Sequence, residues 1–252
     1  MDKITIITFA VPGKAALRGL MMANSLRTFG GDLCESPIWW LVPESRDNFS
    51  NLTRRELKRL KIHIHPIRIN SEVMKFPFGA KVAAAAQAES TAVGLTESLA
   101  WLDLDNIILS QPDELLLTPG KSLAYRPVHH RLIGPTWGEP LDPFWELIHT
   151  SCQVPPDRQF QMVTHTGEKI QPYFNAGTFV TRPENGLLAL WQDTFLDLYQ
   201  QPLYQDWYQK SDLYTIFIHQ AIFTGVILAK LSLQELQLLS PKINYPLHLH
   251  DD

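Results

Sequence analysis

Two aspartates, Asp103 and Asp105, follow an apolar segment at residues 99–102 and have the spacing of a ligand pair. Residues two apart on an extended strand project to the same side, so we expect the two carboxylates to point together where this segment ends. Carboxylates placed so close repel each other unless a cation neutralises them. Oxygen ligands favour Mg²⁺ or Mn²⁺, which can stabilise a departing diphosphate. The competing interpretation of an isolated Asp-x-Asp is a pair of solvated aspartates in a turn.

The segments before these aspartates alternate between short apolar runs and stretches of helical periodicity. This alternation predicts an α/β fold with a central, mainly parallel sheet flanked by helices. We expect strands at residues 4–9, 38–42, 62–67 and 99–102, and helices at residues 14–29, 51–60 and 81–93. The fourth strand is apolar throughout and should be buried on both faces. Ligands bind beyond the carboxyl ends of the strands in open sheets of this kind, which is where Asp103 and Asp105 would lie.

The second half of the chain is less regular. Residues 127–172 carry little periodicity and predict a long excursion over the sheet, as binding loops make. We expect strands at residues 174–181, 226–230 and 235–239, and helices at residues 183–199 and 211–224, the first opened by Pro183 as its N1 residue. No linker marks a domain boundary. The sequence therefore predicts one domain over residues 1–252.

Composition excludes some classes of function and sets expectations for location. A net charge of -4 argues against a nucleic-acid-binding protein. One dense basic run has helical spacing and indicates a solvated helix face rather than a nucleic-acid or lipid patch; it comprises Arg54, Arg55, Lys58, Arg59 and Lys61. Cys34 and Cys152 are expected to be free thiols, with one disulfide as the alternative. Without a leader sequence or an apolar stretch of about 20 residues, the chain is predicted to be cytoplasmic and to lack a transmembrane segment.

The Asp-x-Asp motif and a later segment together suggest a family. Residues 173–180, Tyr-Phe-Asn-Ala-Gly-Thr-Phe-Val, combine with the motif in an order that resembles the GT-A nucleotide-diphospho-sugar transferases, especially the family-8-type retaining enzymes. The resemblance covers nearly the whole chain in motif order and spacing. It implies a nucleotide-binding half at residues 1–110 and a donor-sugar and acceptor half at residues 111–252 of the single domain. It implies a metal-dependent glycosyltransferase that moves a sugar from a nucleotide donor, expected to be a UDP-sugar, with Mn²⁺ or Mg²⁺ as cofactor. The acceptor would be a glycan, a protein or a small molecule.

The same resemblance assigns roles to particular residues. The donor-sugar pocket and the reacting centre would be formed by Asn175, Gly177, His219 and Gln220. The base, ribose and phosphates of the nucleotide would be contacted by Thr8, Phe9, Ala10 and Lys81. The cation would be held by Asp103, Asp105, His248 and His250, the first aspartate also binding the donor.

Some of these residues also have a physical argument of their own. The amide of Asn175 lies in an apolar run and must find partners, which sugar hydroxyls or nearby backbone could provide. Gly177 either allows a ligand to approach the backbone closely or marks a bulge. His248 and His250 alternate and would share a face if extended, and a neutral imidazole can complete a site with two carboxylates. The alternative for both is an exposed position near a chain end.

The sequence departs from the family pattern at two places. His219 occupies the position before Gln220 where an acidic residue is expected, so it could contact the sugar differently, select another sugar or weaken the enzyme. The Gly, Lys and Trp residues that usually follow the late histidine are missing, which leaves open how completely the diphosphate is held. The sequence also leaves three alternatives: a GT-A protein that binds without transfer, a haloacid-dehalogenase-like phosphatase with Asp103 as nucleophile, and a structural protein.

Overall fold

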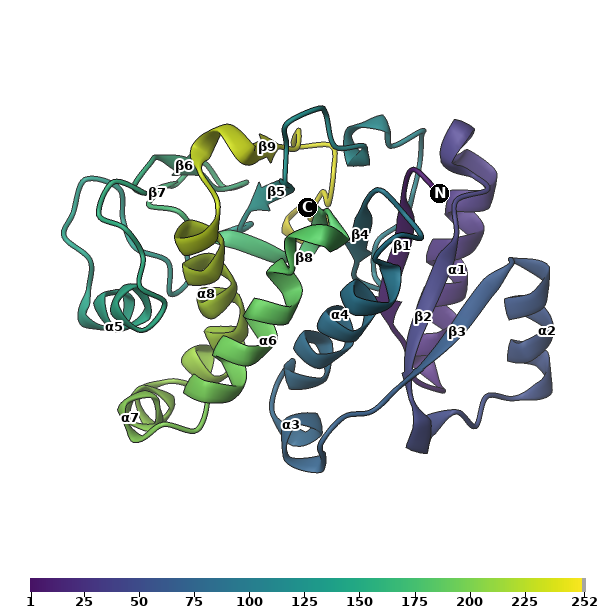
Figure 1. Ribbon diagram of the computed structural model, residues 1–252, viewed down its shortest axis with the longest axis horizontal. Coiled ribbons are helices and arrows are strands. Elements are labelled where there is room, and N and C mark those ends of the chain that lie inside the picture. Colours follow the sequence, from purple (N-terminus) through teal and green to yellow (C-terminus); the bar gives the residue numbers. More distant parts are fainter. Residues whose placement is uncertain (251–252) are drawn as a thin grey trace.

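The computed structural model describes residues 1–250 and is built on a seven-stranded sheet (Figure 1). Its strands, in spatial order, are β3 (Ile62–Ile67), β2 (Ile38–Pro43), β1 (Thr5–Phe9), β4 (Leu99–Leu102), β8 (Phe174–Thr181), β5 (Leu123–Pro127) and β9 (Leu236–Leu238). Neighbouring strands are parallel except at β8, which is antiparallel to both β4 and β5. The predicted mainly parallel α/β sheet is therefore confirmed.

Helices cover both faces of this sheet. One face packs against α1 (Lys14–Phe29) and α2 (Asn51–Arg59). The other packs against α4 (Gly79–Ala92), α6 (Leu187–Leu198) and α8 (Asp212–Lys230). The remaining helices are α3 (Ser71–Lys75), α5 (Pro143–Ser151) and α7 (Pro202–Lys210), and a small second sheet pairs β6 (Met162–Val163) with β7 (Lys169–Ile170).

Strand β4 separates two hydrophobic cores, as its apolar sequence predicts. Leu99 and Trp101 point into the core beneath α4, α6 and α8, whereas Ala100 and Leu102 point into the core beneath α1 and α2. All four side chains are at most 2% exposed. Because both faces of β4 are filled by apolar side chains, the polar residues that follow it can only be accommodated beyond its carboxyl end.

Local polar contacts explain where several helices begin. Ser50 caps α2 by accepting from the Thr53 N–H, and Asp142 caps α5 by accepting from the Trp145 N–H. Helix α6 instead follows Gly186, which has no side chain to cap it. The buried carboxylate of Glu89 in α4 accepts from the N–H groups of Leu188 and Ala189 at 2.8 to 3.1 Å. This contact fixes the start of α6 against α4.

Two predictions about the second half are wrong in detail. Pro183 does not open α6, because Pro183–Asn185 form a separate 3₁₀ turn and Gly186 adopts a left-handed conformation with φ 61° before α6 begins at Leu187. Residues 226–230, predicted as a strand, continue α8. A short aliphatic run fits a buried strand and a buried helix equally well, so sequence periodicity alone could not distinguish them.

The irregular region contains more structure than its sequence predicts. Helix α5 lies inside it, with Asp142 as N-cap and Pro143 at N1. Strand β5, which leads into this region, was not anticipated at all.

By length and composition α8 could cross a membrane, although 61% of its most apolar window is buried in this structure. Both cysteines are free thiols, as predicted.

Candidate active site

The polar residues gather at the edge of the sheet where β1, β4 and β5 end. These three strands run in the same direction, and β8 runs in the opposite one, so β8 begins at the edge where they stop. Ala10, Asp103 and Asn175 consequently lie at this shared edge. The topology thus brings together two segments that are about 70 residues apart in the sequence, as ligand sites in open α/β sheets require.

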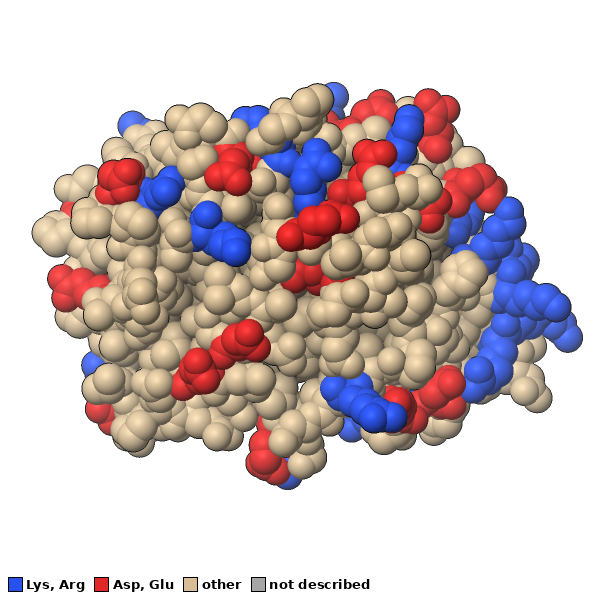
Figure 2. Space-filling model, in the orientation of Figure 1, with Lys and Arg blue, Asp and Glu red and all other residues tan. Residues whose placement is uncertain are grey.

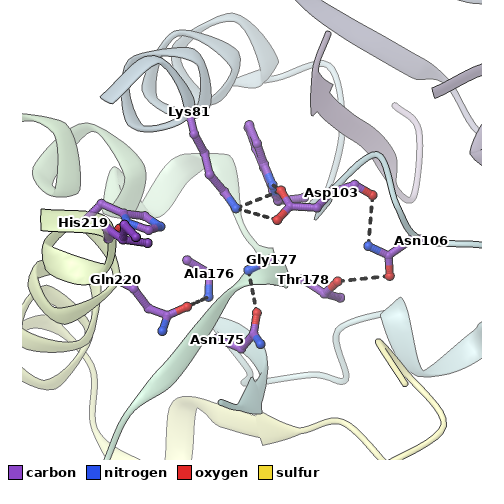
Figure 3. A network of polar contacts seen from close by, with 11 residues as sticks. Lys81, Asp103, Asn106, Asn175, Ala176, Gly177, Thr178, His219 and Gln220 are labelled. Atoms are coloured by element: carbon purple, nitrogen blue, oxygen red, sulfur yellow. Dashed lines mark hydrogen bonds and ion pairs between the residues drawn. The ribbon is translucent and has the colours of Figure 1, made fainter. Parts of the chain in front are cut away.

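Asp103 is the most connected side chain at this edge (Figure 3). The ammonium of Lys81, on α4, lies 2.8 Å from one carboxylate oxygen and 3.0 Å from the other. The indole N–H of Trp101 donates to the first oxygen at 2.7 Å. The Lys81 side chain is 7% exposed and that of Asp103 36% exposed. Lys81 was predicted to face the nucleotide; here its buried charge is paired with Asp103.

Asp105 has a different environment from Asp103. The strand ends at Leu102, so the two-residue alternation that predicted parallel carboxylates does not extend to Asp105. Asp103 and Asp105 lie in a turn that is closed by the Asn106 N–H donating to the Asp103 carbonyl at 3.1 Å. Asp105 is exposed, and its carboxylate has no hydrogen-bond or ion-pair partner within residues 1–250. It is therefore free to bind a ligand without breaking an existing contact.

Gly177 preserves a space between Asp103 and Asn175. A Cβ atom at Gly177 would lie 3.0 Å from a carboxylate oxygen of Asp103 and 2.9 Å from the amide oxygen of Asn175. The pairing of β8 with β4 is regular as far as Thr178, but the pairing of β8 with β5 shifts register between Phe174 and Phe179. Gly177 lies in this irregular stretch, so a bulge stays an alternative to the close approach of a ligand. Asn175 accepts from the Gly177 N–H at 2.6 Å, a contact with nearby backbone that leaves its amide N–H groups available.

His219 is buried in the core next to the site. It is 3% exposed, its ring is stacked on Phe78 at 4.4 Å, and its Nδ1–H donates to the Ile216 carbonyl at 2.8 Å. Burial, reinforced by the charge of Lys81, lowers the pKa of His219 from 6.5 to about 3. The ring is therefore neutral at pH 7 and cannot replace the charge of the acidic residue expected at this position.

We expect protonation of His219 to lower the folding stability as the pH falls. Its depressed pKa means that the unfolded chain binds a proton there that the folded chain does not, so the stabilisation is complete above pH 6.5 and is lost as the pH falls toward 3. At pH 5 the loss is about 2 kcal/mol. His219→Asn should remove this part of the pH dependence in urea unfolding at pH 7 and 5. Identical pH dependence in both proteins would contradict the assignment.

Gln220 holds α8 against β8. Its side chain is 7% exposed, and its amide oxygen accepts from the Ala176 N–H at 3.0 Å, immediately beside Asn175 (Figure 3). The contact places Gln220 near the predicted sugar pocket and shows how its oxygen is used in this structure. A role at the reacting centre stays a prediction.

The late histidines lie among other histidines. They do not form an extended segment, because His248 lies in the 3₁₀ turn Leu247–Leu249. The His248 ring is 6.1 Å from that of His129, and Nε2 of His250 is 2.8 Å from Nε2 of His165. Asn244 connects this group to the site, since its carbonyl contacts His129 and its amide nitrogen would lie 3.8 Å from a Gly177 Cβ. Ligation of a cation by His248 or His250 stays a prediction.

The carboxylates near this edge are of the type that a hard divalent cation prefers as ligands. Among residues 1–250, no three His, Cys, Asp or Glu side chains gather as a complete metal site. Magnesium and manganese are commonly held by one or two carboxylates, with phosphate oxygens and water completing the shell. Asp103 and Asp105 could supply those carboxylates, and the space at Gly177 is bounded by two oxygen atoms.

The predicted nucleotide contacts on β1 are less accessible than expected. Thr8 is 1% exposed, and its hydroxyl has no partner in the part of the chain that the structure describes. Ala10 is fully buried, and Phe9 packs partly against the core beneath α4. The partly exposed side chain of Phe9 and the backbone at the end of β1 are thus the groups left to meet a base or ribose, and these contacts stay predictions.

The fold and the shared edge define a GT-A glycosyltransferase, a transferase enzyme. The profile of the Rhodobacterales glycosyltransferase domain matches residues 6–216, and the chain belongs to this family. The match favours an enzyme over a non-catalytic binding protein. The phosphatase alternative is also unsupported, because Asp103 follows the fourth strand in sequence rather than the first.

Solved structures share the fold at low sequence identity. Mouse xyloside xylosyltransferase 1 is 14% identical with a TM-score of 0.52, over 96% of this chain and 86% of that one. The galactosyltransferase LgtC, in complex with donor and acceptor sugar analogues, is 15% identical with a TM-score of 0.51, over 94% and 74%. Core-mannan synthase A from Aspergillus fumigatus, in a Mn/GDP form, is 6% identical with a TM-score of 0.50, over 95% and 73%. No curated protein sequence matches the chain.

Proposed function

We propose that the protein transfers a sugar from a UDP-sugar, with Mn²⁺ or Mg²⁺ as cofactor, to a glycan, protein or small-molecule acceptor in the cytoplasm. The observation that carries the proposal is the convergence of Asp103, Asn175 and Gly177 at the carboxyl edge of a GT-A sheet. The family-8 resemblance supports the choice of UDP. The similar solved structures include a xylosyltransferase and a galactosyltransferase, which agrees with sugar transfer.

Charge at the site favours metal dependence. Asp103 and Asp105 carry two negative charges and Lys81 one positive charge. The net charge of the three side chains is therefore -1, which would repel a diphosphate. A divalent cation would reverse the sign of this sum and stabilise the charge that develops on the departing diphosphate. The buried Lys81 fixes the position of the Asp103 carboxylate in advance, which reduces the cost of ordering it on binding.

Chain groups around the space at Gly177 suit a sugar. The amide N–H groups of Asn175 can donate to a hydroxyl, while the missing side chain of Gly177 lets a ring approach the strand. The neutral, buried His219 implies that the donor sugar is not held by a charged side chain at that position.

A thermal-shift screen tests the proposal. We expect UDP and UDP-sugars with Mn²⁺ to raise the unfolding temperature by about 5 °C at saturating concentrations, and other nucleoside diphosphates to raise it less. The same ligands with a chelator in place of Mn²⁺ should have little effect. The absence of a shift with any nucleotide or nucleotide sugar would contradict the proposal.

Asn175→Ala should weaken binding of a UDP-sugar about tenfold while changing binding of UDP less than twofold, because its proposed partner is the sugar. Asn175→Asp keeps an acceptor for the Gly177 N–H but removes the amide donor. It should therefore also weaken binding of the UDP-sugar more than binding of UDP. Calorimetric titration with each ligand measures both. Equal losses for UDP and UDP-sugar would place Asn175 outside the sugar pocket.

A further inference from the structure

The outer face of α1 is unusually apolar and basic for a solvent-facing helix. Leu17 and Met21 lie one turn apart and are each 61% exposed. Lys14 and Arg18 are exposed on the same side, and the helix contains no acidic residue. Large exposed aliphatic side chains spaced along a cationic helix face are typical of a surface that meets a partner.

Helix α2 extends this surface on one side. Arg59 of α2 donates to the side-chain oxygen of Asn24 in α1 at 3.2 Å, which places the two helices side by side. Leu52, at the start of α2, is 72% exposed. Figure 2 shows lysine and arginine side chains in a continuous column along the edge of the molecule where α2 lies. The basic run, which the sequence alone indicated to be a solvated helix face, therefore adjoins an exposed apolar side chain in the structure.

The segment after Asp105 extends the surface on the other side of α1. The hydroxyl of Ser25 in α1 accepts from the Ile108 N–H at 2.9 Å, so this segment runs beside the helix. Its Leu109 is 76% exposed. We call the whole surface the α1–α2 face; it comprises Lys14, Leu17, Arg18, Met21, Leu52, Arg55, Lys58, Arg59 and Leu109.

The cations of this face are largely uncompensated. Arg59 pairs with Glu56, but over residues 1–250 no carboxylate lies within ion-pair distance of Lys14, Arg18, Arg55 or Lys58. The chain as a whole has a net charge of -4. Positive charge is thus concentrated on one side of an acidic protein, so an anionic surface would attract this face and repel most others.

We propose that the α1–α2 face docks the protein onto an anionic lipid bilayer. The cations meet lipid phosphates, and the aliphatic side chains between them enter the headgroup region, where their burial adds to the attraction. The aliphatic side chains are interspersed with cations on the outer sides of two helices. A protein-binding surface would instead gather them into a contiguous apolar centre depleted of charge. Since α1 begins beside Ala10, the bilayer would border the candidate active site.

Sedimentation with vesicles tests the proposal independently of nucleotide binding. The full chain should bind phosphatidylcholine vesicles that contain about 30% phosphatidylglycerol and should not bind pure phosphatidylcholine, and binding should fall as salt shortens the Debye length. Arg55→Glu/Lys58→Glu should lower the partition coefficient at least tenfold, because each cation lost weakens binding about fivefold. Leu17→Ser/Met21→Ser should also lower it about tenfold, because less apolar surface is buried.

A matched control separates this face from net charge. Lys169→Glu/Lys242→Glu makes the same change in charge at exposed positions elsewhere and should keep full binding. Circular dichroism melts establish that each variant is folded. The proposal fails if anionic vesicles do not bind the protein or if the control loses as much binding as Arg55→Glu/Lys58→Glu. It also fails if Leu17→Ser/Met21→Ser converts a dimer to a monomer, which would assign the face to a second copy of the chain.

Discussion

Asp105→Ala is expected to weaken Mn²⁺-dependent binding of UDP at least 100-fold while changing the unfolding temperature by less than about 2 °C. The first effect follows because Asp105 would supply one of only two carboxylates for the cation, and the diphosphate would bind through that cation. The second follows because the side chain is exposed and has no partner to lose within residues 1–250. Calorimetric titration of UDP with Mn²⁺ measures the first effect, and a thermal melt measures the second.

Asp193→Ala is the matched control, since Asp193 is an exposed aspartate on α6 rather than at the carboxyl edge of the sheet. It should bind UDP as the parent does. If Asp105→Ala also retains parental binding, Asp105 is not a cation ligand.

Asp103→Ala should also abolish nucleotide binding and, unlike the change at Asp105, destabilise the fold. It leaves the Lys81 ammonium buried without its carboxylate and the Trp101 indole N–H without its acceptor. Breaking a fully buried ion pair costs roughly 3–5 kcal/mol, and the partial exposure of Asp103 reduces this to about 2 kcal/mol. For a chain of this size, the unfolding temperature should fall by about 4–8 °C.

A second variant separates the charge effect from general damage. In Asp103→Ala/Lys81→Met, no buried charge remains unpaired, so most of the lost stability should return while nucleotide binding stays absent. Thermal melts of the two variants measure the difference. If the double variant is as unstable as the single one, the Lys81 charge is not the cause of the destabilisation.

Local sequence patterns predicted the first half of the fold well because its signals are local. Strands β1, β2 and β4 are short, largely apolar runs, and β3 alternates isoleucine with more polar residues. The helices between them have helical periodicity, so the existence, order and parallel pairing of these strands could be anticipated. The second half depends more on distant contacts. The start of α6 is fixed by Glu89, about 100 residues earlier, and no local pattern around Gly186 could reveal that.

Some residues at the candidate site could be predicted from the sequence, but their arrangement could not. The Asp-x-Asp motif and the segment around Asn175 could be found because their order resembles a family. The contact between Asp103 and Lys81 could not, since it depends on how α4 packs over the end of β4. The burial of His219 against Phe78 could not be predicted either, because a histidine in the middle of a helix pattern has no preferred environment.

The most direct test of the account is anomalous diffraction from crystals of the protein grown with Mn²⁺ and UDP. The account predicts a manganese peak bound by the carboxylates of Asp103 and Asp105, with the diphosphate on the same ion and the space at Gly177 open beside it. A nucleotide bound away from this edge, or a manganese peak that touches neither aspartate, would contradict it.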